Sequence, residues 1–181
     1  MTLAVSLLRG INVGGRNKIR MADLRELYVS LGMKNVRSLL QSGNVIFETA
    51  LTDLTSVKLE LEAGIHSAFG LDIQVLLRSS GNFEDIIARH PFSAEQLNEP
   101  RKAAVVFLSD APESPAVDAL SESNPGREVI HAAGCELYIF YTDGMARSKL
   151  DNKRIESRLG LIATARNWNT CIKLQRLLAE T

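Results

Sequence analysis

A glycine-rich segment near the start of the chain combines basic side chains with a flexible backbone, which is a composition suited to anion binding. Residues 9–18 read RGINVGGRNK and contain three glycines and three cations. Backbone amides in such a turn can point toward a phosphate group, and arginine and lysine counter its charge. The segment therefore predicts a site for an anionic, phosphorylated or nucleotide-like small molecule. Its predicted ligand-binding residues are Arg9, Gly10, Asn12, Gly14, Gly15 and Lys18.

The segment departs from the phosphate-binding loop of nucleoside triphosphatases, G-x-x-x-x-G-K-[ST]. Gly10 and Gly15 have the right spacing, but Arg16 and Asn17 stand where that loop needs a lysine and a magnesium-holding hydroxyl. A structural alternative is open: the glycines serve a tight loop that needs positive φ angles, while Asn12 and Asn17 form local hydrogen bonds. The cations would then be solvated. The segment alone does not decide between the two interpretations.

Two other polar segments could complete a site. Residues 41–44, Gln-Ser-Gly-Asn, form a predicted hairpin between two central strands, and ordinary turn chemistry is the alternative role for them. Near the other end, Arg166 and Asn167 precede Trp168 at the start of a last helix, whose free amides attract anions. Helix capping by Asn167 and core packing of Trp168 are the alternatives there. The predicted ligand-binding residues in these segments are Gln41, Ser42, Asn44, Arg166 and Asn167.

No arrangement of a nucleophile with a base emerges. Ser42 lies in the sequence SGN and not in a G-x-S-x-G elbow, and no histidine can be assigned to it. Cys135 and Cys171 form no CxxC motif, and the three histidines have no metal-ligand spacing with them. We therefore expect no metal site, and the sequence names neither a cofactor nor a reaction.

Composition and charge narrow the class of protein. The 181 residues are 45% hydrophobic and 23% charged, which is typical of a globular protein, and the formal net charge is zero. That balance argues against a strongly cationic coat for nucleic acid. The charge is unevenly distributed, however: residues 1–37 hold seven basic and two acidic side chains, and residues 145–181 hold eight and three. If the two ends of the chain meet in space, they form a positive surface.

The first apolar run gives an expectation about location. Residues 3–8 are too few to cross a bilayer, and no basic residue precedes them, as a signal peptide requires. We expect a cytoplasmic protein with reduced thiols and no membrane partner.

Hydrophobic spacing predicts the order β-α-β-β-α-β in the first half and an approximate repeat of it in the second. In the first half, strands are expected at 3–8, 36–40, 44–49 and 73–77, and helices at 21–31 and 54–69. In the second half, strands are expected at 103–108, 128–132, 135–141 and 162–165, and helices at 83–89, 114–122, 151–159 and 168–178. Residues 91–102, with Pro100, are expected to be a linker.

This order predicts an α+β protein of two ferredoxin-like (split βαβ) pseudo-repeats with antiparallel sheets and an extra C-terminal helix. We expect a first half at 1–80, a linking helix and linker at 81–102, and a second half with the closing helix at 103–181. In such a unit the end of the first strand lies beside the start of the third. Residues 9–12 and 42–44 should therefore lie close together, and we expect them to form one cationic pocket with residues 166–168.

The assembled motifs identify the chain as resembling a bacterial family, the domain of unknown function 1697. The resemblance covers essentially the whole chain and rests on LLRGINVGGRNKIRMADLR at 7–25, LLQSGNVIFET at 39–49 and TARNWNTCIKL at 164–174. It implies that these motifs mark the family, with Arg16 fitting a usual basic or small residue. Ala165 stands where the family often has Thr, which weakens a hydroxyl role there. Because the family has no known activity, the resemblance implies a fold and supplies no reaction.

Two other functions remain open beside small-molecule binding. One is a nucleic-acid module, because the RNA-recognition fold has the same sheet. That fold stacks bases on aromatic residues of its central strands, and here those strands offer only Phe47, so we expect backbone contacts through the basic ends instead. The other is an interaction scaffold without a ligand, which predicts a large exposed apolar patch.

Overall fold

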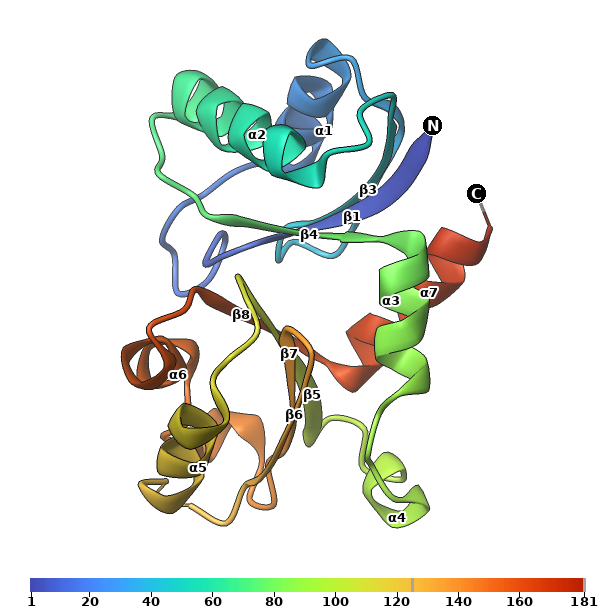
Figure 1. Cartoon of the computed structure of the whole chain (residues 1–181). Helices are drawn as coiled ribbons and strands as arrows, with labels where there is room; N and C mark the ends of the chain where they lie inside the picture. The colour runs from blue at the N-terminus through green and yellow to red at the C-terminus, as the bar shows by residue number, and fades with distance from the viewer. Residues whose placement is uncertain (125, 181) are drawn as a thin grey trace. The chain divides into compact units, whose positions relative to one another are not determined.

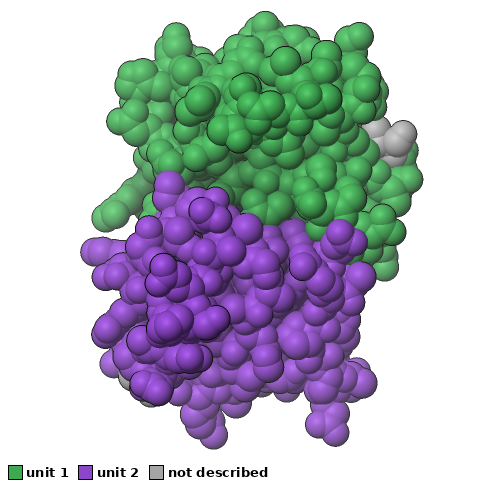
Figure 2. Space-filling model, viewed as in Figure 1, with its two compact units in different colours: residues 1–84, 174–181 green, residues 85–173 purple. Residues whose placement is uncertain are grey.

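The computed structural model describes residues 1–124 and 126–180, which divide into two compact units (Figures 1 and 2). Unit 1 comprises Met1–Glu84 and the described residues of Leu174–Thr181, and unit 2 is Asp85–Lys173. The chain passes between the units inside two helices, α3 (Ser80–Ala88) and α7 (Trp168–Ala179). Each unit contains one four-stranded antiparallel sheet with helices between its strands, so the predicted α+β class with two ferredoxin-like repeats is confirmed.

Unit 1 has the predicted element order and the sheet order β2-β3-β1-β4. Its elements are β1 (Thr2–Leu8), α1 (Met21–Ser30), β2 (Lys34–Leu39), β3 (Asn44–Thr49), α2 (Leu54–Phe69) and β4 (Val75–Ser79). Helices α1 and α2 lie side by side over one face of the sheet (Figure 1). The expectation that both strands joined by residues 41–44 are central is wrong, because β2 is an edge strand.

The core of unit 1 forms where the apolar faces of α1 and α2 meet the sheet. Leu24 and Tyr28 lie one helical turn apart on α1, and both are fully buried beside Phe47 of β3. The Tyr28 and Phe47 rings pack edge to face with centroids 5.4 Å apart. Ser6 Oγ and the Tyr28 hydroxyl lie 2.8 Å apart in a hydrogen bond that satisfies both buried groups. Burial raises the pKa of Tyr28 well above its ordinary value.

Unit 2 repeats the arrangement with the sheet order β6-β7-β5-β8, and α5 and α6 cover one face of its sheet. Its elements, besides the part of α3 and α7 that it contains, are α4 (Ala94–Leu97), β5 (Ala103–Leu108), α5 (Ser114–Glu122), β6 (Val129–Ala133), β7 (Glu136–Phe140), a 3₁₀ turn (Met145–Arg147), α6 (Asn152–Leu159) and β8 (Ala163–Asn167). Helix α4 corrects the expectation of a plain linker at 91–102. A capping box nucleates it, in which Ser93 and Gln96 exchange hydrogen bonds between side chain and backbone.

Aromatic side chains form a second buried group in unit 2. The Trp168 ring packs edge to face against His90 and Phe92, with centroid distances of 4.8 and 5.4 Å. Phe92 also contacts Tyr138, whose hydroxyl donates a hydrogen bond to the Ile86 carbonyl over 2.7 Å. Trp168 is therefore a core anchor, as one of the two sequence interpretations had it.

Buried thiol and phenol groups make the stability of the fold sensitive to alkaline pH. Burial raises the pKa of Cys171 and of Tyr138 to about 12, from 9.0 and 10.0. Between those values the folded state keeps protons that the unfolded chain has released, so the native state becomes less stable as pH rises. We expect the free energy of unfolding to fall from about pH 9 toward pH 12, by up to about 1.4 kcal/mol per pH unit for each of the two groups. Arg166, whose pKa burial lowers to about 10, opposes part of this fall above pH 10.

Urea unfolding from about pH 8 to pH 11 measures this dependence. Cys171→Ala should flatten the decline that begins near pH 9. Tyr138→Phe should remove its share of the decline that begins near pH 10, to which the buried Tyr28 and Tyr141 also contribute. An unfolding free energy that stays constant to pH 11 would contradict the prediction.

Candidate functional site

The first loop, residues 9–20 between β1 and α1, is held together by asparagine side chains. Asn12 Nδ2 donates to the Ile19 carbonyl over 2.9 Å, and Asn12 Oδ1 accepts from the Ile19 amide over 3.0 Å. Asn17 Nδ2 donates to the Gly10 carbonyl over 3.1 Å. The buried side chains of Ile11 and Ile19 anchor both ends of the loop in the core. The predicted local hydrogen bonds of Asn12 and Asn17 are confirmed.

The tip of this loop uses backbone conformations that favour glycine. Gly14 and Gly15 have φ angles of 59° and 75°, in the left-handed region. Asn12 and Asn17 also have positive φ angles, which asparagine tolerates better than most residues. Both glycines are exposed. Within the described residues, neither of their N–H groups has an acceptor, so both amides face solvent at the loop tip.

The turn before β3 lies against the first loop, as the strand order predicts. Leu7 pairs with Asn44 across the sheet, and the Leu8 amide donates to the Gly43 carbonyl over 2.9 Å. Asn12 Nδ2 donates a second hydrogen bond, over 2.8 Å, to the Gln41 carbonyl. One asparagine side chain therefore joins the two segments that the sequence singles out.

Asn44 has a structural role in that turn. Its side chain is fully buried, and Nδ2 donates to the Leu39 carbonyl over 2.9 Å and to Ser42 Oγ over 3.0 Å. These bonds fix the shape of the turn from inside. Asn44 thus positions Gln41 and Ser42, which lie nearer the surface.

A groove of about 440 Å³ runs between the first loop and the turn; we call it the first-loop groove. Its lining residues are Asn12, Gly15, Lys18, Ile19, Arg20 and Gln41. Lys18 and Arg20 are exposed, and the Arg20 guanidinium lies 3.8 Å from the Asp23 carboxylate. Four of the lining residues are ones that the sequence predicts for a ligand site. Arg20 was not among them, although its place after the buried Ile19 at the end of the basic loop is a usable signal.

The remaining predicted residues have other surroundings. Arg9 is half-buried, and its amide donates to the Gln74 carbonyl over 2.9 Å. Arg166 lies in β8, only 7% exposed, and its Nη1 donates to Thr164 Oγ1 and to the Ala165 carbonyl, both over 2.8 Å. Burial lowers the pKa of Arg166 to about 10. It therefore belongs to a strand and not to the predicted helix start.

Asn167 caps α7, as one interpretation of the sequence had it. Its Oδ1 accepts hydrogen bonds from the Thr170 amide over 2.9 Å and the Thr170 hydroxyl over 3.0 Å. Because Arg166 and Asn167 belong to unit 2, the expectation that they join the first-loop groove stays a prediction.

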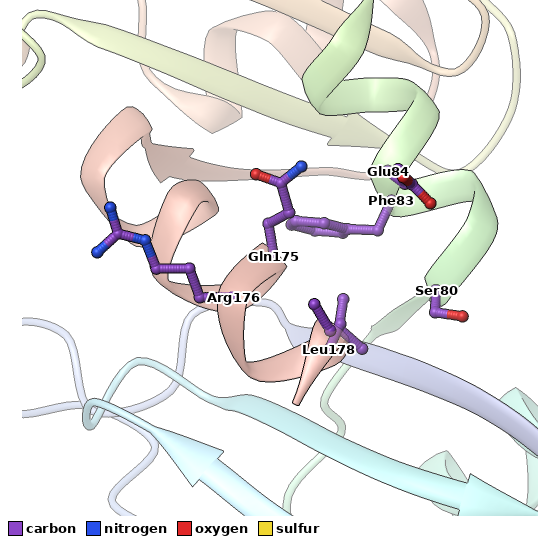
Figure 3. Close-up of a pocket in the computed structure, with 7 residues that line it drawn as sticks. Ser80, Phe83, Glu84, Gln175, Arg176 and Leu178 are labelled. Carbon is purple, nitrogen blue, oxygen red and sulfur yellow. The ribbon is translucent and has the colours of Figure 1, made fainter. Parts of the chain in front are cut away.

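A second hollow in unit 1, of about 290 Å³, lies between α3 and α7 (Figure 3). The buried side chains of Phe83 and Leu178 are among its lining residues. In Figure 3 the Arg176 side chain extends away from Phe83, and the Glu84 carboxylate points to the other side. Its charged groups do not converge, so we assign it no ligand.

The described part of the chain contains no group of side chains suited to bind a metal and no helix suited to cross a membrane. Across residues 1–124 and 126–180, no three His, Cys, Asp or Glu side chains gather as metal ligands would. None of the described helices has both the length and the hydropathy that crossing a bilayer requires.

The fold and this site define a class: an α+β protein of two ferredoxin-like repeats, with a cationic groove beside a glycine-rich loop. The family model for a protein of unknown function, DUF1697, matches residues 1–138, and the chain belongs to this family. The family to which the sequence motifs point is thereby confirmed; the matched residues include the motifs at 7–25 and 39–49 and end before the motif at 164–174.

A solved structure similar to this chain is that of the conserved bacterial protein SP0830 from Streptococcus pneumoniae. The two chains are 27% identical, 98% of each is covered, and the TM-score is 0.76. The similarity extends over both repeats, in agreement with the two-repeat fold. No curated protein matches the chain.

Proposed function

We propose that the protein binds an anionic small molecule, phosphorylated or nucleotide-like, in the first-loop groove. The observation that supports this most directly is that Lys18 and Arg20 line the same groove as the exposed Gly15. Cations supply the countercharge to a phosphate, and backbone N–H groups donate hydrogen bonds to its oxygens. A loop that served only to connect β1 with α1 would not require either feature.

The loop is already organised for such a ligand. The Asn12 side chain forms hydrogen bonds with Ile19 and with the Gln41 carbonyl. The first loop and the turn are therefore held in place before a ligand binds. Preorganisation of this kind reduces the entropy lost on association. In this proposal Lys18, Arg16 and Arg20 counter charge, Gly14 and Gly15 donate amides, and the Gln41 side chain orients the ligand.

The other predicted residues have supporting roles in the proposal. Ser42 and Asn44 shape the turn that carries Gln41. Arg9, Arg166 and Asn167 remain proposed contributors, with Arg9 and Arg166 adding positive charge. The proposal concerns binding, and no reaction is assigned.

We expect phosphorylated ligands to raise the unfolding free energy of the native chain. A ligand at about 100 times its dissociation constant adds about 2.7 kcal/mol. The measurement is a thermal-shift series at low salt with nucleotides, sugar phosphates and inorganic phosphate as probes. Arg16→Glu/Lys18→Glu should abolish the shift, because it replaces two countercharges with two like charges.

The matched control is Lys173→Glu/Arg176→Glu, which changes the net charge equally through two exposed side chains of α7. It should keep the shift. If none of these probes raises the melting temperature of the wild-type chain, the proposal is wrong and the interpretation as an interaction scaffold is favoured. If both double variants lose the shift equally, the effect is one of net charge and not of the groove.

A nucleic-acid module that reads bases on its sheet is disfavoured by one side chain. Phe47, the aromatic residue that the central strands of unit 1 offer, is fully buried against Tyr28. It cannot stack on a base without unfolding the core.

A further inference from the structure

Helix α6 of unit 2 presents a strongly basic face to solvent. An open groove of about 450 Å³ lies along this face; we call it the α6 groove. Its lining residues are Lys149, Asp151, Lys153, Arg154, Ser157 and Arg158. The opposite side of the helix is apolar, since Ile155 is fully buried in the unit 2 core and Leu159 packs against it. The sequence therefore divides α6 into a core face and a cationic face.

The carboxylates of this region do not neutralise the groove. Asp151 is its one acidic lining residue, and Asp151 Oδ1 caps the helix by accepting the Arg154 amide over 2.8 Å. Glu156, the carboxylate within α6, accepts the Ala163 amide of β8 over 2.9 Å. A carboxylate that accepts a backbone amide keeps its charge, so the lining of the α6 groove, with four cations and Asp151, carries a net charge of +3.

The exposed cations of the groove lack the ion pairs found elsewhere on the protein. Within the described residues, no carboxylate lies within 4.0 Å of the amino groups of Lys149 and Lys153 or the guanidinium of Arg158. Ion pairs elsewhere include Lys58 with Glu62, Lys102 with Glu99, and Arg127 with Asp143.

Two of the groove cations repel each other within α6. Arg154 and Arg158 stand four residues apart, a like-charged pair that destabilises a helix by about 0.2–0.5 kcal/mol. Arg154 is held in place by a hydrogen bond from Nη2 to the Ser123 carbonyl over 2.5 Å. Its buried Nε has no hydrogen-bond partner among the described residues. An anion on the groove would relieve the repulsion.

We infer that the α6 groove binds a chain of phosphates, either the backbone of a single-stranded nucleic acid or a linear polyphosphate. With Asp151 included, the lining carries four positive charges and one negative charge, so a single carboxylate would leave two positive charges uncompensated. A phosphate chain carries several negative charges along one direction, as the cations are arranged along the helix. The groove is open to solvent and none of its lining residues is aromatic, so we expect contacts with phosphates and not with bases. This site belongs to unit 2, whereas the first-loop groove belongs to unit 1.

Fluorescence anisotropy with the whole chain tests the inference. The probe is a short fluorescein-labelled oligothymidylate, titrated at several salt concentrations from about 50 to 200 mM. Lys153→Glu/Arg158→Glu should weaken binding at least about tenfold at the lowest salt. Each lost phosphate contact should also reduce the slope of log affinity against log salt by about 0.7, or about 1.4 for the pair.

Two controls separate the α6 groove from net charge and from the first loop. Lys173→Glu/Arg176→Glu makes the same change in net charge, and Arg16→Glu/Lys18→Glu alters the first-loop groove; both should bind the probe as the wild-type chain does. Because Lys153 and Arg158 are exposed, their replacement should leave the circular dichroism melt unchanged. Lys149→Glu, outside the helix, gives a second variant that should also weaken binding.

Competition identifies the source of the phosphates. Displacement of the probe by tripolyphosphate at low concentration supports a free polyphosphate, and displacement only by unlabelled oligonucleotide supports nucleic acid. The inference is overturned if the wild-type chain binds neither. It is equally overturned if the α6 double variant binds unchanged, or if the α7 double variant weakens binding as much.

Discussion

Replacement of Gly43 by alanine should destabilise the native state by about 2–5 kcal/mol, with two separate causes. Gly43 has a φ angle of 74°, where an L-residue costs about 1–2 kcal/mol. A Cβ atom there would also lie 2.7 Å from Ile11 Cδ1 and 2.7 Å from Leu8 Cβ. Both neighbours are fixed in the core, so the overpacking adds about 1–3 kcal/mol.

The matched control is Gly14→Ala in the first loop. Gly14 has a similar φ angle, 59°, but a Cβ atom there would meet nothing within 4 Å. Urea denaturation should therefore give a loss of only about 1–2 kcal/mol for Gly14→Ala. If the two variants lose the same free energy, Ile11 and Leu8 have room to move and the packing argument is wrong.

Replacement of Trp168 by alanine should cost about 3–5 kcal/mol, because a large buried ring is lost and a cavity remains. Trp168 is buried, and its edge contacts with His90 and Phe92 contribute beyond the area that it hides. Thermal or urea unfolding measures the loss. Trp168→Phe, which keeps an aromatic ring in the cluster, should recover part of it.

The same pair of variants tests the rejected role of Trp168 as a base-stacking platform. Binding of the labelled oligonucleotide should not depend on this side chain as long as the variant is folded. A small stability loss in Trp168→Ala, together with lost oligonucleotide binding, would contradict the core-anchor assignment.

The sequence predicts those elements best whose ends carry their own local signals. Helix α2 matches its predicted range because Asp53 caps its start, accepting the amides of Thr55 and Ser56, and Gly70 ends it. Strand β4 is displaced by two residues from the predicted 73–77. Its partner decides its limits, since Arg78 and Ser79 pair with β1. Pairing across a sheet is not visible in a single segment.

Prediction of the site follows the same distinction. The adjacency of residues 9–12 and 42–44 is predictable because strand order alone brings them together, and the hydrogen bond from Asn12 to the Gln41 carbonyl meets that expectation. The burial of Arg166 is not predictable from the sequence, because a basic residue before a predicted helix is usually exposed. Its place in β8 follows from pairing with Val105 of β5.

The cationic face of α6 was also missed, although the sequence holds a signal for it. Arg154 and Arg158, like Lys153 and Ser157, have the four-residue spacing of one helix face. What the sequence does not contain is the engagement of Asp151 and Glu156 by backbone amides. The structure adds that Glu156 is held against β8 and is not among the residues that line the α6 groove.

The division of the chain has a consequence for its synthesis. Unit 2 is contiguous, whereas unit 1 includes the end of α7, where Arg37 Nη2 donates to the Leu177 carbonyl over 2.6 Å. A ribosome synthesises the chain from its N-terminus, and domains generally fold in the order in which they emerge. Here the unit that begins first receives the segment from Leu174 onward only after all of unit 2 has been synthesised, so unit 2 can close before unit 1 is complete. A nascent chain stalled before Leu174 would contain all residues of unit 2 but would lack the last segment of unit 1.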